Sequence, residues 1–441
     1  MTNALQRILP DQTNADTRAA TIKGALVLGV LPCIAIALLL SVSAHLITPL
    51  FNVADKDSHQ LEMAITLFVW AIPLWATVEI TTSALRACKA FGPEIRLRLL
   101  WEQVIRLVLV VLFWMAGFDT LALVLAHLAS LVLTGILALR ALNRYISLKL
   151  VWNAGLSTSM LRELLISGLS ILPLNILGRT FSDMPIIILN ILLPGAAGAN
   201  AAGLYSLARK VSSIPQLVGT VFSHVLAPVA ASSENREVAT IQSLYSFSIR
   251  LSILLSLPTT IILIIYADSL LSLFVTGAAA AWPIVVILTI ARGFESTVGP
   301  ATAIQQAISH RGLPVLNGII GLISATVVTL IAFPLYSTIG VALGVATGQV
   351  IMAALAVWQL SSMENLHAYD STSLRICSAA LTACLAIFVA GRLTSVAPSY
   401  IQGSVVLLVY LMTIWFSLRF ALPIHDRLVL GKLGHRFRLI S

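Results

Sequence analysis

The fold follows from two long apolar stretches of similar sequence: ATIKGALVLGVLPCIAIALLLSVSAHLITPLF (residues 20–51) and ATIQSLYSFSIRLSILLSLPTTIILIIYADSLLSLF (residues 239–274). Each opens on Ala-Thr-Ile, carries few charges and closes on Leu-Phe. An apolar run of this length predicts a membrane-spanning helix. Its recurrence predicts that the chain contains two like halves.

The similarity between the two halves extends beyond these runs. A proline precedes each run at a similar distance, Pro10 in the first copy and Pro228 in the second. Further segments match in the same order, 83–92 with 302–312 (allowing one gap) and 120–122 with 338–340. Because both copies run in the same direction, we expect two similar lobes side by side, an arrangement typical of transporters.

The composition indicates that lipid is the solvent. Hydrophobic residues make up 58% of the 441 residues, charged residues only 10%, and the mean hydropathy is +0.96. A water-soluble domain could not cover its surface with so few charges, so we predict an all-α integral membrane protein. The expected spans, about twelve, are 25–47, 63–84, 99–117, 119–139, 164–186, 202–228, 244–266, 283–305, 314–334, 339–360, 374–393 and 402–421.

The net charge of +9 is explained by topology and not by nucleic-acid binding. Basic residues collect on alternate connections between the spans, among them Arg7, Arg18, Lys23, Arg86, Arg96, Arg98, Arg140, Arg144, Lys149, Arg162, Arg311 and the tail Arg427, Lys432, Arg436 and Arg438. The opposite connections hold mainly acidic residues: Asp55, Asp57, Glu62, Asp119 and Asp268. By the positive-inside rule, both termini are expected in the cytoplasm.

The predicted organisation is unequal. We expect an N-terminal lobe over residues 1–150, a C-terminal lobe over 151–362, and two additional helices with a basic tail over 363–441. In the second copy two spans precede the proline marker, whereas in the first the marker lies at the start of the chain. The first lobe is therefore expected to have four spans where the second has six, and to lack the first helical hairpin.

Small residues recur at every fourth position of one span in each half. They are Gly340, Gly344 and Gly348 in the second copy, and Ala122, Ala126 and Ser130 in the first. This spacing lets two helix backbones approach closely, so we expect a structural role in helix packing.

Charged residues inside the predicted spans are the candidate binding residues, because each is costly in hydrocarbon unless it faces a cavity or a partner. The candidates that we select belong to the second copy: Arg179, Asp183, Arg209, Lys210, Arg292 and Glu295. Glu79 and Arg106, in the second and third spans, lie closer to the cytoplasmic end, and Arg250 is interpreted as part of an interfacial helix, so these three are not selected. Asp183 and Arg209 are each about ten residues, or roughly 15 Å, from the hairpin tip that joins their spans. This equal depth makes an ion pair between them feasible.

Cationic side chains near the middle of the membrane predict a site for an anion, and phosphate suits the guanidinium group because it is bound bidentately. An alternative interpretation is that Arg179 with Asp183, and Arg292 with Glu295, are internal ion pairs that only lock helices together.

The sequence contains no catalytic motif, no cofactor motif and no metal-ligand cluster, and its four cysteines are interpreted as small packing residues. We therefore expect neither an ATP-driven pump nor a membrane hydrolase.

Two stretches resemble a known family. AGLYSLARK (residues 202–210), followed by VLAP (residues 225–228), is similar to the start of the second half of polysaccharide transporters. These are the lipid-linked oligosaccharide flippases of the multidrug/oligosaccharidyl-lipid/polysaccharide superfamily. Asp183 and residues 84–87 fit the same pattern.

The resemblance implies two six-helix lobes around a cavity, with two further C-terminal helices. It also implies translocation of an undecaprenyl-pyrophosphate-linked oligosaccharide across a bacterial inner membrane, with a polysaccharide polymerase and export machinery as further partners. Two alternatives are a cation-coupled multidrug antiporter of the same superfamily and a polytopic glycosyltransferase. The first usually relies on acidic residues of the first lobe, and the second needs a large outer loop, which this sequence lacks.

Overall fold

Every regular element that the computed structural model describes is a helix. The described residues are 1–12, 14–51, 58–88, 90, 92, 96–170, 172–217, 238–274, 277–308, 312–367, 369, 371–395, 397 and 399–429. The marker at Pro228, the basic positions 311, 432, 436 and 438, and the acidic positions 55 and 57 lie outside this set.

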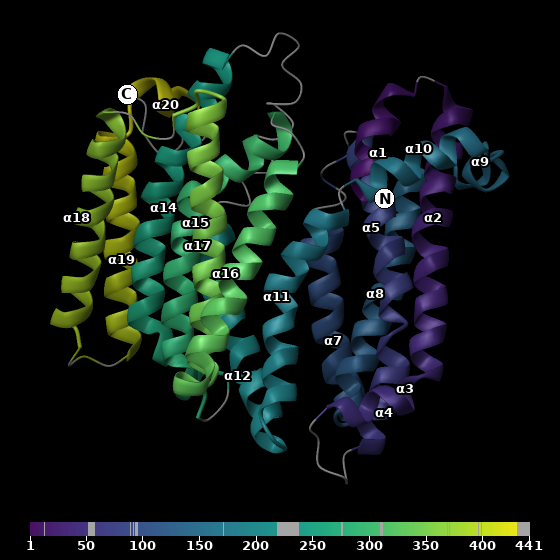
Figure 1. Ribbon diagram of the computed structural model, residues 1–441, viewed down its shortest axis with the longest axis horizontal. Coiled ribbons are helices and arrows are strands. Elements are labelled where there is room, and N and C mark those ends of the chain that lie inside the picture. Colours follow the sequence, from purple (N-terminus) through teal and green to yellow (C-terminus); the bar gives the residue numbers. More distant parts are fainter. Residues whose placement is uncertain are drawn as a thin grey trace. The chain divides into compact units, whose positions relative to one another are not determined.

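The chain divides into two compact units, Met1–Asn175 and Ile176–Ser441, and the division falls within one helix (Figure 1). The predicted boundary at residue 150 stays a prediction.

The first unit contains the helices up to the division. They are α1 (Thr2–Ile8), the 3-10 helix η1 (Leu9–Asp11), α2 (Ala15–Val42), α3 (Ala44–Ile47), η2 (Thr48–Leu50), α4 (Ser58–Phe68), α5 (Ala71–Ala87), the π-helix η4 (Arg96–Trp101), α7 (Glu102–Met115), α8 (Leu121–Asn143), α9 (Leu148–Asn153), α10 (Thr158–Leu169) and the start of α11 (Leu172–Leu192).

The second unit contains the rest. Its helices are the remainder of α11, α12 (Ala196–Ser212), α14 (Val238–Ser272), η5 (Ala278–Ala281), α15 (Trp282–Ile308), α16 (Gly312–Tyr336), α17 (Thr338–Met363), α18 (Ser371–Leu393), α19 (Ser399–Phe416), the π-helix η6 (Ser417–Ala421) and α20 (Ile424–Val429).

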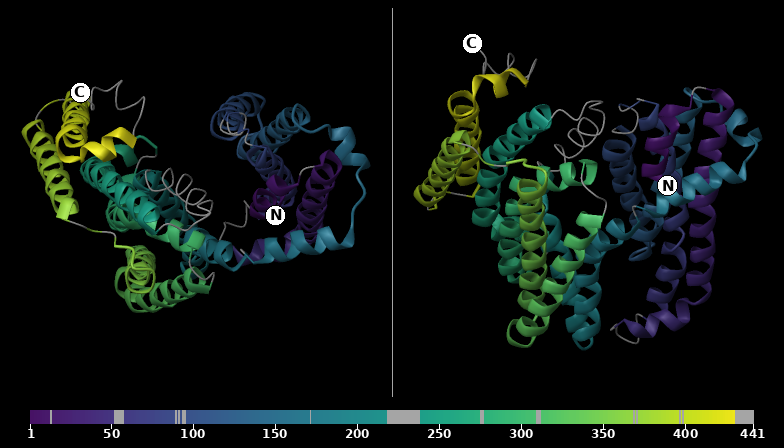
Figure 2. Two further views of the ribbon diagram at one scale, coloured as in Figure 1. Left: turned by 90° about the horizontal axis from the view of Figure 1, so that it is seen from above. Right: turned by 45° about the horizontal axis from the view of Figure 1, so that its top comes forward.

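Helix neighbours repeat between the units, as the internal sequence similarity predicts. In the first unit α8 packs against α5 and α7, and α5 also packs against α2. In the second unit α17 packs against α15 and α16, and α15 also packs against α14. The additional pair, α18 and α19, lies side by side and packs on α14 (Figures 1 and 2).

The small-residue motif lies where these helices approach most closely. A Cβ atom at Gly344 would be 2.6 Å from the backbone oxygen of Ala325 on α16, and one at Gly348 would be 2.5 Å from that of Gly321. In the first unit the matching Ala122, Ala126 and Ser130 are fully or almost fully buried. The predicted structural role of the motif is confirmed for the second unit.

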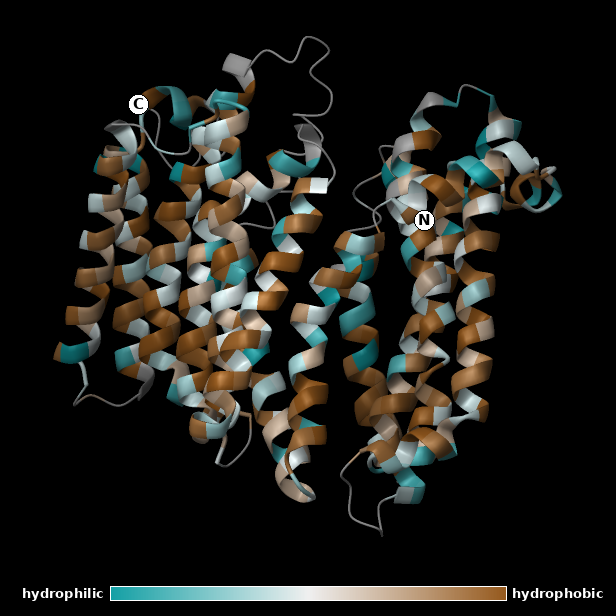
Figure 3. Cartoon of the chain, in the orientation of Figure 1, coloured by the Kyte–Doolittle hydropathy of each residue, from teal (hydrophilic) through white to brown (hydrophobic). Residues whose placement is uncertain are grey.

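The outer surfaces of the helices suit lipid. Large apolar side chains such as Leu39, Leu330 and Leu385 are 63–70% exposed, and hydrophobic residues (brown) run along the long helices in Figure 3. Within the described residues, ten helices are long and apolar enough to cross a membrane. The chain is a multi-pass membrane protein.

Two expected spans differ in detail. The one predicted over 99–117 is a π-helix followed by the 14-residue α7, where charged residues interrupt the apolar run. In the one predicted over 202–228, α12 ends at Ser212, three residues before Pro215. Proline lacks the backbone N–H that a continuing helix would need, so the helix is interrupted there.

Candidate functional site

An ion pair joins α11 and α12 near the middle of α11. Nη1 of Arg209 donates to Oδ1 of Asp183 at 3.0 Å and to the backbone oxygen of Ser182 at 2.6 Å. The side chain of Arg209 is 24% exposed and that of Asp183 is 48% exposed. The ion pair that equal depth made feasible is therefore present, and both partners remain partly exposed.

Helix α12 ends within one turn of this arginine, at Ser212. The amide of Ser213 donates to the carbonyl of Lys210, three residues back, so the regular α-helical bond to the carbonyl of Arg209 is not made. The carbonyl of Arg209 instead accepts from Nη1 of Arg292 on α15 and from the hydroxyl of Ser212 at 3.1 Å. A carbonyl freed by the helix interruption is thus bonded by side chains.

Arg292 lies behind this arrangement and is only 6% exposed. Besides the carbonyl of Arg209, its Nη1 donates to the Ser212 hydroxyl at 3.1 Å. Both acceptors belong to the last turn of α12, so Arg292 contacts that helix end directly.

Two further side chains of α15 hold the segment after the interruption. Oε2 of Glu295 accepts from Nε2 of the Gln216 side chain at 2.7 Å. The hydroxyl of Ser296 donates to the carbonyl of Pro215 at 2.8 Å and lies 2.7 Å from the hydroxyl of Ser256 on α14. Residues 292, 295 and 296 lie on one face of a helix, because positions three and four apart are neighbours.

The six predicted residues differ in exposure. Arg179 and Lys210 are exposed, Asp183, Arg209 and Glu295 are partly exposed, and Arg292 is buried. Asp183 bonds Arg209, and Glu295 accepts from Gln216. Both carboxylates therefore engage a partner on another element. Glu295 also lies close enough to Arg292 on its own helix to attract it electrostatically, so the interpretation as internal ion pairs stays an alternative.

Sequence reasoning missed the uncharged members of the network: Ser212, Gln216, Ser256 and Ser296. Serine and glutamine are common in helices and carry no signal alone. Pro215, which lies shortly after two cations in an apolar span, was the available signal that backbone groups would be freed at this point.

The first unit contains a separate set of ion pairs. Arg98 donates to Glu79 on α5 at 2.6 Å, and Arg106 donates to Glu102 one turn back on α7 at 2.5 Å. Each arginine is paired with one carboxylate, so this set carries no net charge. It therefore offers less attraction to an anion than the residues of the second unit.

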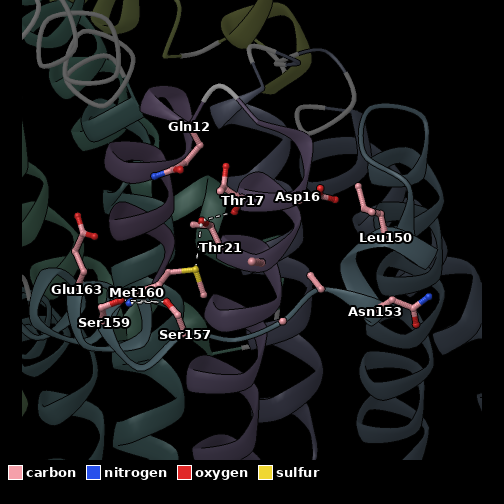
Figure 4. A pocket seen from close by; sticks show the side chains of 13 residues that line it. Gln12, Asp16, Thr17, Thr21, Leu150, Asn153, Ser157, Ser159, Met160 and Glu163 are labelled. Atoms are coloured by element: carbon pink, nitrogen blue, oxygen red, sulfur yellow. Dashed lines mark hydrogen bonds between the residues drawn. The ribbon is translucent and has the colours of Figure 1, made fainter.

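A pocket of about 620 Å³ opens at one end of α2, between α2 and the connection from α9 to α10 (Figure 4). Its lining includes Asp16 and Glu163 together with the hydroxyl groups of Thr17, Ser157 and Ser159. None of the predicted binding residues lines it. Among the described residues, no three histidine, cysteine, aspartate or glutamate side chains lie close enough to hold a metal ion.

The chain is similar to known proteins in its sequence family and in its fold. A family model described as "Polysaccharide biosynthesis protein" matches residues 9–282, more than half of the chain. No curated protein sequence matches the chain.

Several solved structures share the architecture. The lipid II flippase MurJ, in an inward closed conformation, superposes with a TM-score of 0.69 over 94% of this chain and 87% of that one, at 14% identity. A MATE transporter of Vibrio cholerae gives a TM-score of 0.64 over 83% and 85%, at 15% identity. A superfamily transporter of Pyrococcus furiosus gives 0.61 over 83% and 82%, also at 15% identity. At these identities the likeness shows the fold, which is the two-lobed all-helical architecture of this transporter superfamily.

Proposed function

The chain belongs to the polysaccharide biosynthesis protein family, and from this premise we propose that it is a flippase for a lipid-linked oligosaccharide. The substrate is an undecaprenyl-pyrophosphate-linked glycan used to build a surface polysaccharide such as O-antigen, capsule or exopolysaccharide. The protein moves it from the cytoplasmic to the periplasmic leaflet of a bacterial inner membrane. No catalytic step on the glycan is part of this function.

The observation that carries the proposal is an excess of positive charge on apolar helices of the second unit. Four cations (Arg179, Arg209, Lys210 and Arg292) accompany two carboxylates (Asp183 and Glu295). Ionisable groups at such positions are costly unless a partner or a polar cavity receives them. A pyrophosphate group supplies the missing negative charge and can accept bidentate bonds from guanidinium groups.

The exposure of the side chains supports a different role for each residue. Arg179 and Lys210 are exposed and Arg209 is partly exposed, so these three are the pyrophosphate contacts. Asp183 balances Arg209 when no substrate is bound. Arg292 and Glu295 act behind them, on the interrupted end of α12.

The alternating charge along the chain supports cytoplasmic N- and C-termini. In this orientation the saccharide enters from the side on which it is made, and the lipid tail stays in the bilayer. A polysaccharide polymerase and export machinery would use the product on the far side.

Glycan export in the native host tests the proposal. Arg179→Ala and Arg209→Ala should each lower surface polysaccharide several-fold while the protein remains in the membrane fraction. Arg144→Ala, at an exposed arginine of the first unit, is the matched control and should export normally. Normal export by both test variants would overturn the proposed anion site.

The alternative function is that of a cation-coupled multidrug antiporter. It is considered because this chain shares its fold with a MATE transporter. The same strains can separate the two functions. Loss of the protein should reduce surface polysaccharide and leave drug susceptibility unchanged if it is a flippase, and the reverse result would favour the antiporter.

A further inference from the structure

The interruption of α12 lies beside a partly exposed cation, Arg209. Arg209 is the last but three residue of α12, and its carbonyl receives no regular helical bond from the amide of Ser213. Within apolar surroundings a carbonyl without a donor costs free energy and allows the helix end to move. A donor that bonds the carbonyl of Arg209 therefore holds the backbone of this residue in place, and with it the base of the Arg209 side chain.

Three residues on one face of α15 form hydrogen bonds with the chain on either side of the interruption. Arg292 donates to the carbonyl of Arg209, Ser296 donates to the carbonyl of Pro215 at 2.8 Å, and Glu295 accepts from Gln216 at 2.7 Å. The contacts lie on both sides of the interruption. The face of α15 thus connects the two parts of a discontinuous helix.

We propose that Arg292 is a positioning residue for anion binding: it holds the freed carbonyl of Arg209 and thereby fixes the Arg209 guanidinium where the pyrophosphate binds. The inference rests on the proposed function, since Arg209 is the anion contact there. It adds that the buried arginine acts through the backbone of the exposed one and does not touch the substrate.

The burial and bonding of Arg292 favour this role over direct contact. Arg292 is 6% exposed, whereas the side chain of Arg209 is 24% exposed, so an anion reaches Arg209 first. The Nη1 donor of Arg292 is directed at the last turn of α12, and its Nε is buried, so neither faces the open side. A residue that contacted the anion would need its donors directed toward the open side.

The same bonds distinguish Arg292 from an arginine that only locks helices. Arg250 on α14 is equally buried, and it donates to the carboxylate of Asp426 at 2.7 Å. Arg292 instead bonds a neutral carbonyl and a hydroxyl that belong to the anion-binding segment. Arg250 is therefore the matched control for the loss of a buried arginine.

Binding of inorganic pyrophosphate to the purified full chain in lipid nanodiscs tests the inference. Arg209→Gln and Arg292→Gln should each weaken binding about tenfold, and the double variant should be no weaker than either single one. Arg292→Lys, which keeps a cationic donor, should recover part of the affinity. Arg250→Gln should lower thermal stability and leave the affinity unchanged.

Other combinations of affinities would overturn the positioning role of Arg292, the anion site, or both. If Arg209→Gln weakens binding and Arg292→Gln does not, the inference fails and the proposed function stands. A double variant weakened about a hundredfold would show that Arg292 contacts the anion itself, which also overturns the inference. Wild-type affinity in Arg209→Gln, or no binding by the unaltered chain, would overturn both.

Ser212→Ala keeps the test decisive if Arg292→Gln does not fold. It removes the hydroxyl that accepts from Arg292 and donates to the carbonyl of Arg209. We expect binding about threefold weaker, in line with one lost hydrogen bond. Unchanged affinity in this variant would contradict the positioning role.

Discussion

Nη1 of Arg250 on α14 donates to Oδ2 of Asp426 on α20 at 2.7 Å, although the two residues are 176 positions apart. Their side chains are only 7% and 2% exposed. The second oxygen of Asp426 lies 2.9 Å from Nε2 of His425. This buried pair attaches the helix that follows the last long span to α14.

Breaking this pair should destabilise the second unit. Asp426→Asn removes the carboxylate that Arg250 bonds inside the protein, and loss of one partner of a buried ion pair typically costs about 3–5 kcal/mol. We expect a clear fall in the thermal unfolding temperature in detergent. The double variant Arg250→Met/Asp426→Leu should recover most of the loss, because apolar side chains can replace a buried pair. Single variants as stable as the original chain would contradict this account.

Removing the charge of Asp183 should tighten anion binding. Asp183→Asn frees Arg209 from its carboxylate, while the carbonyl of Ser182 still holds the guanidinium at 2.6 Å. Because the pair is partly exposed and screened by solvent, we expect pyrophosphate affinity to rise only about threefold. Asp268→Asn, at an exposed carboxylate of α14, is the control and should bind like the original chain. Weaker binding by Asp183→Asn would show that the carboxylate orients Arg209.

A methyl group at Gly344 should separate α16 from α17. Its Cβ would lie 2.6 Å from the backbone oxygen of Ala325, so main-chain atoms would have to move. Overpacking of this kind costs about 1–3 kcal/mol, measurable as a lower unfolding temperature for Gly344→Ala. Gly299→Ala in α15 is the matched control, since no atom lies within 4 Å of its added Cβ. Equal stability of the two variants would refute close helix approach.

Loss of the Lys23 ammonium should loosen the connection from α9 to α10. Nζ of Lys23 donates to the carbonyls of Trp152 and Ala154 at 2.7 and 2.8 Å. In Lys23→Met these carbonyls lose their donor, so backbone amides of residues 155–160 should exchange hydrogen faster in mass spectrometry. Lys149→Met, at an exposed lysine of α9, should leave exchange unchanged. An unaltered rate in the first variant would mean that the connection is held by other contacts.

Local properties of the sequence predicted most of the fold. An apolar run such as residues 239–274 excludes water-soluble structure, and in lipid its backbone groups must bond within the segment, so it forms a helix. The repeated small residues at 340, 344 and 348 predicted a close helix contact, because glycine spacing directly limits how near two backbones can come.

The candidate site was only partly predictable. Equal depth on consecutive antiparallel helices made an ion pair between Asp183 and Arg209 feasible, because the hairpin fixes the height of both residues. The bonds of Arg292 could not be read in the same way. Its acceptor is a main-chain carbonyl, which exists in every residue and becomes available only where the helix is interrupted.

The membrane class, the helical content and the duplication can be read from the sequence, because hydropathy and periodicity are properties of neighbouring residues. The pairing of the charged side chains within the spans depends on tertiary packing. The depth of a residue in the membrane follows from its distance along the helix. The partner of its side chain depends on how each helix is rotated about its axis and on where the helix is interrupted. Arg292 bonds the carbonyl of Arg209, and not Glu295 one turn away, because packing of α15 against α12 turns its face toward the interruption near Pro215.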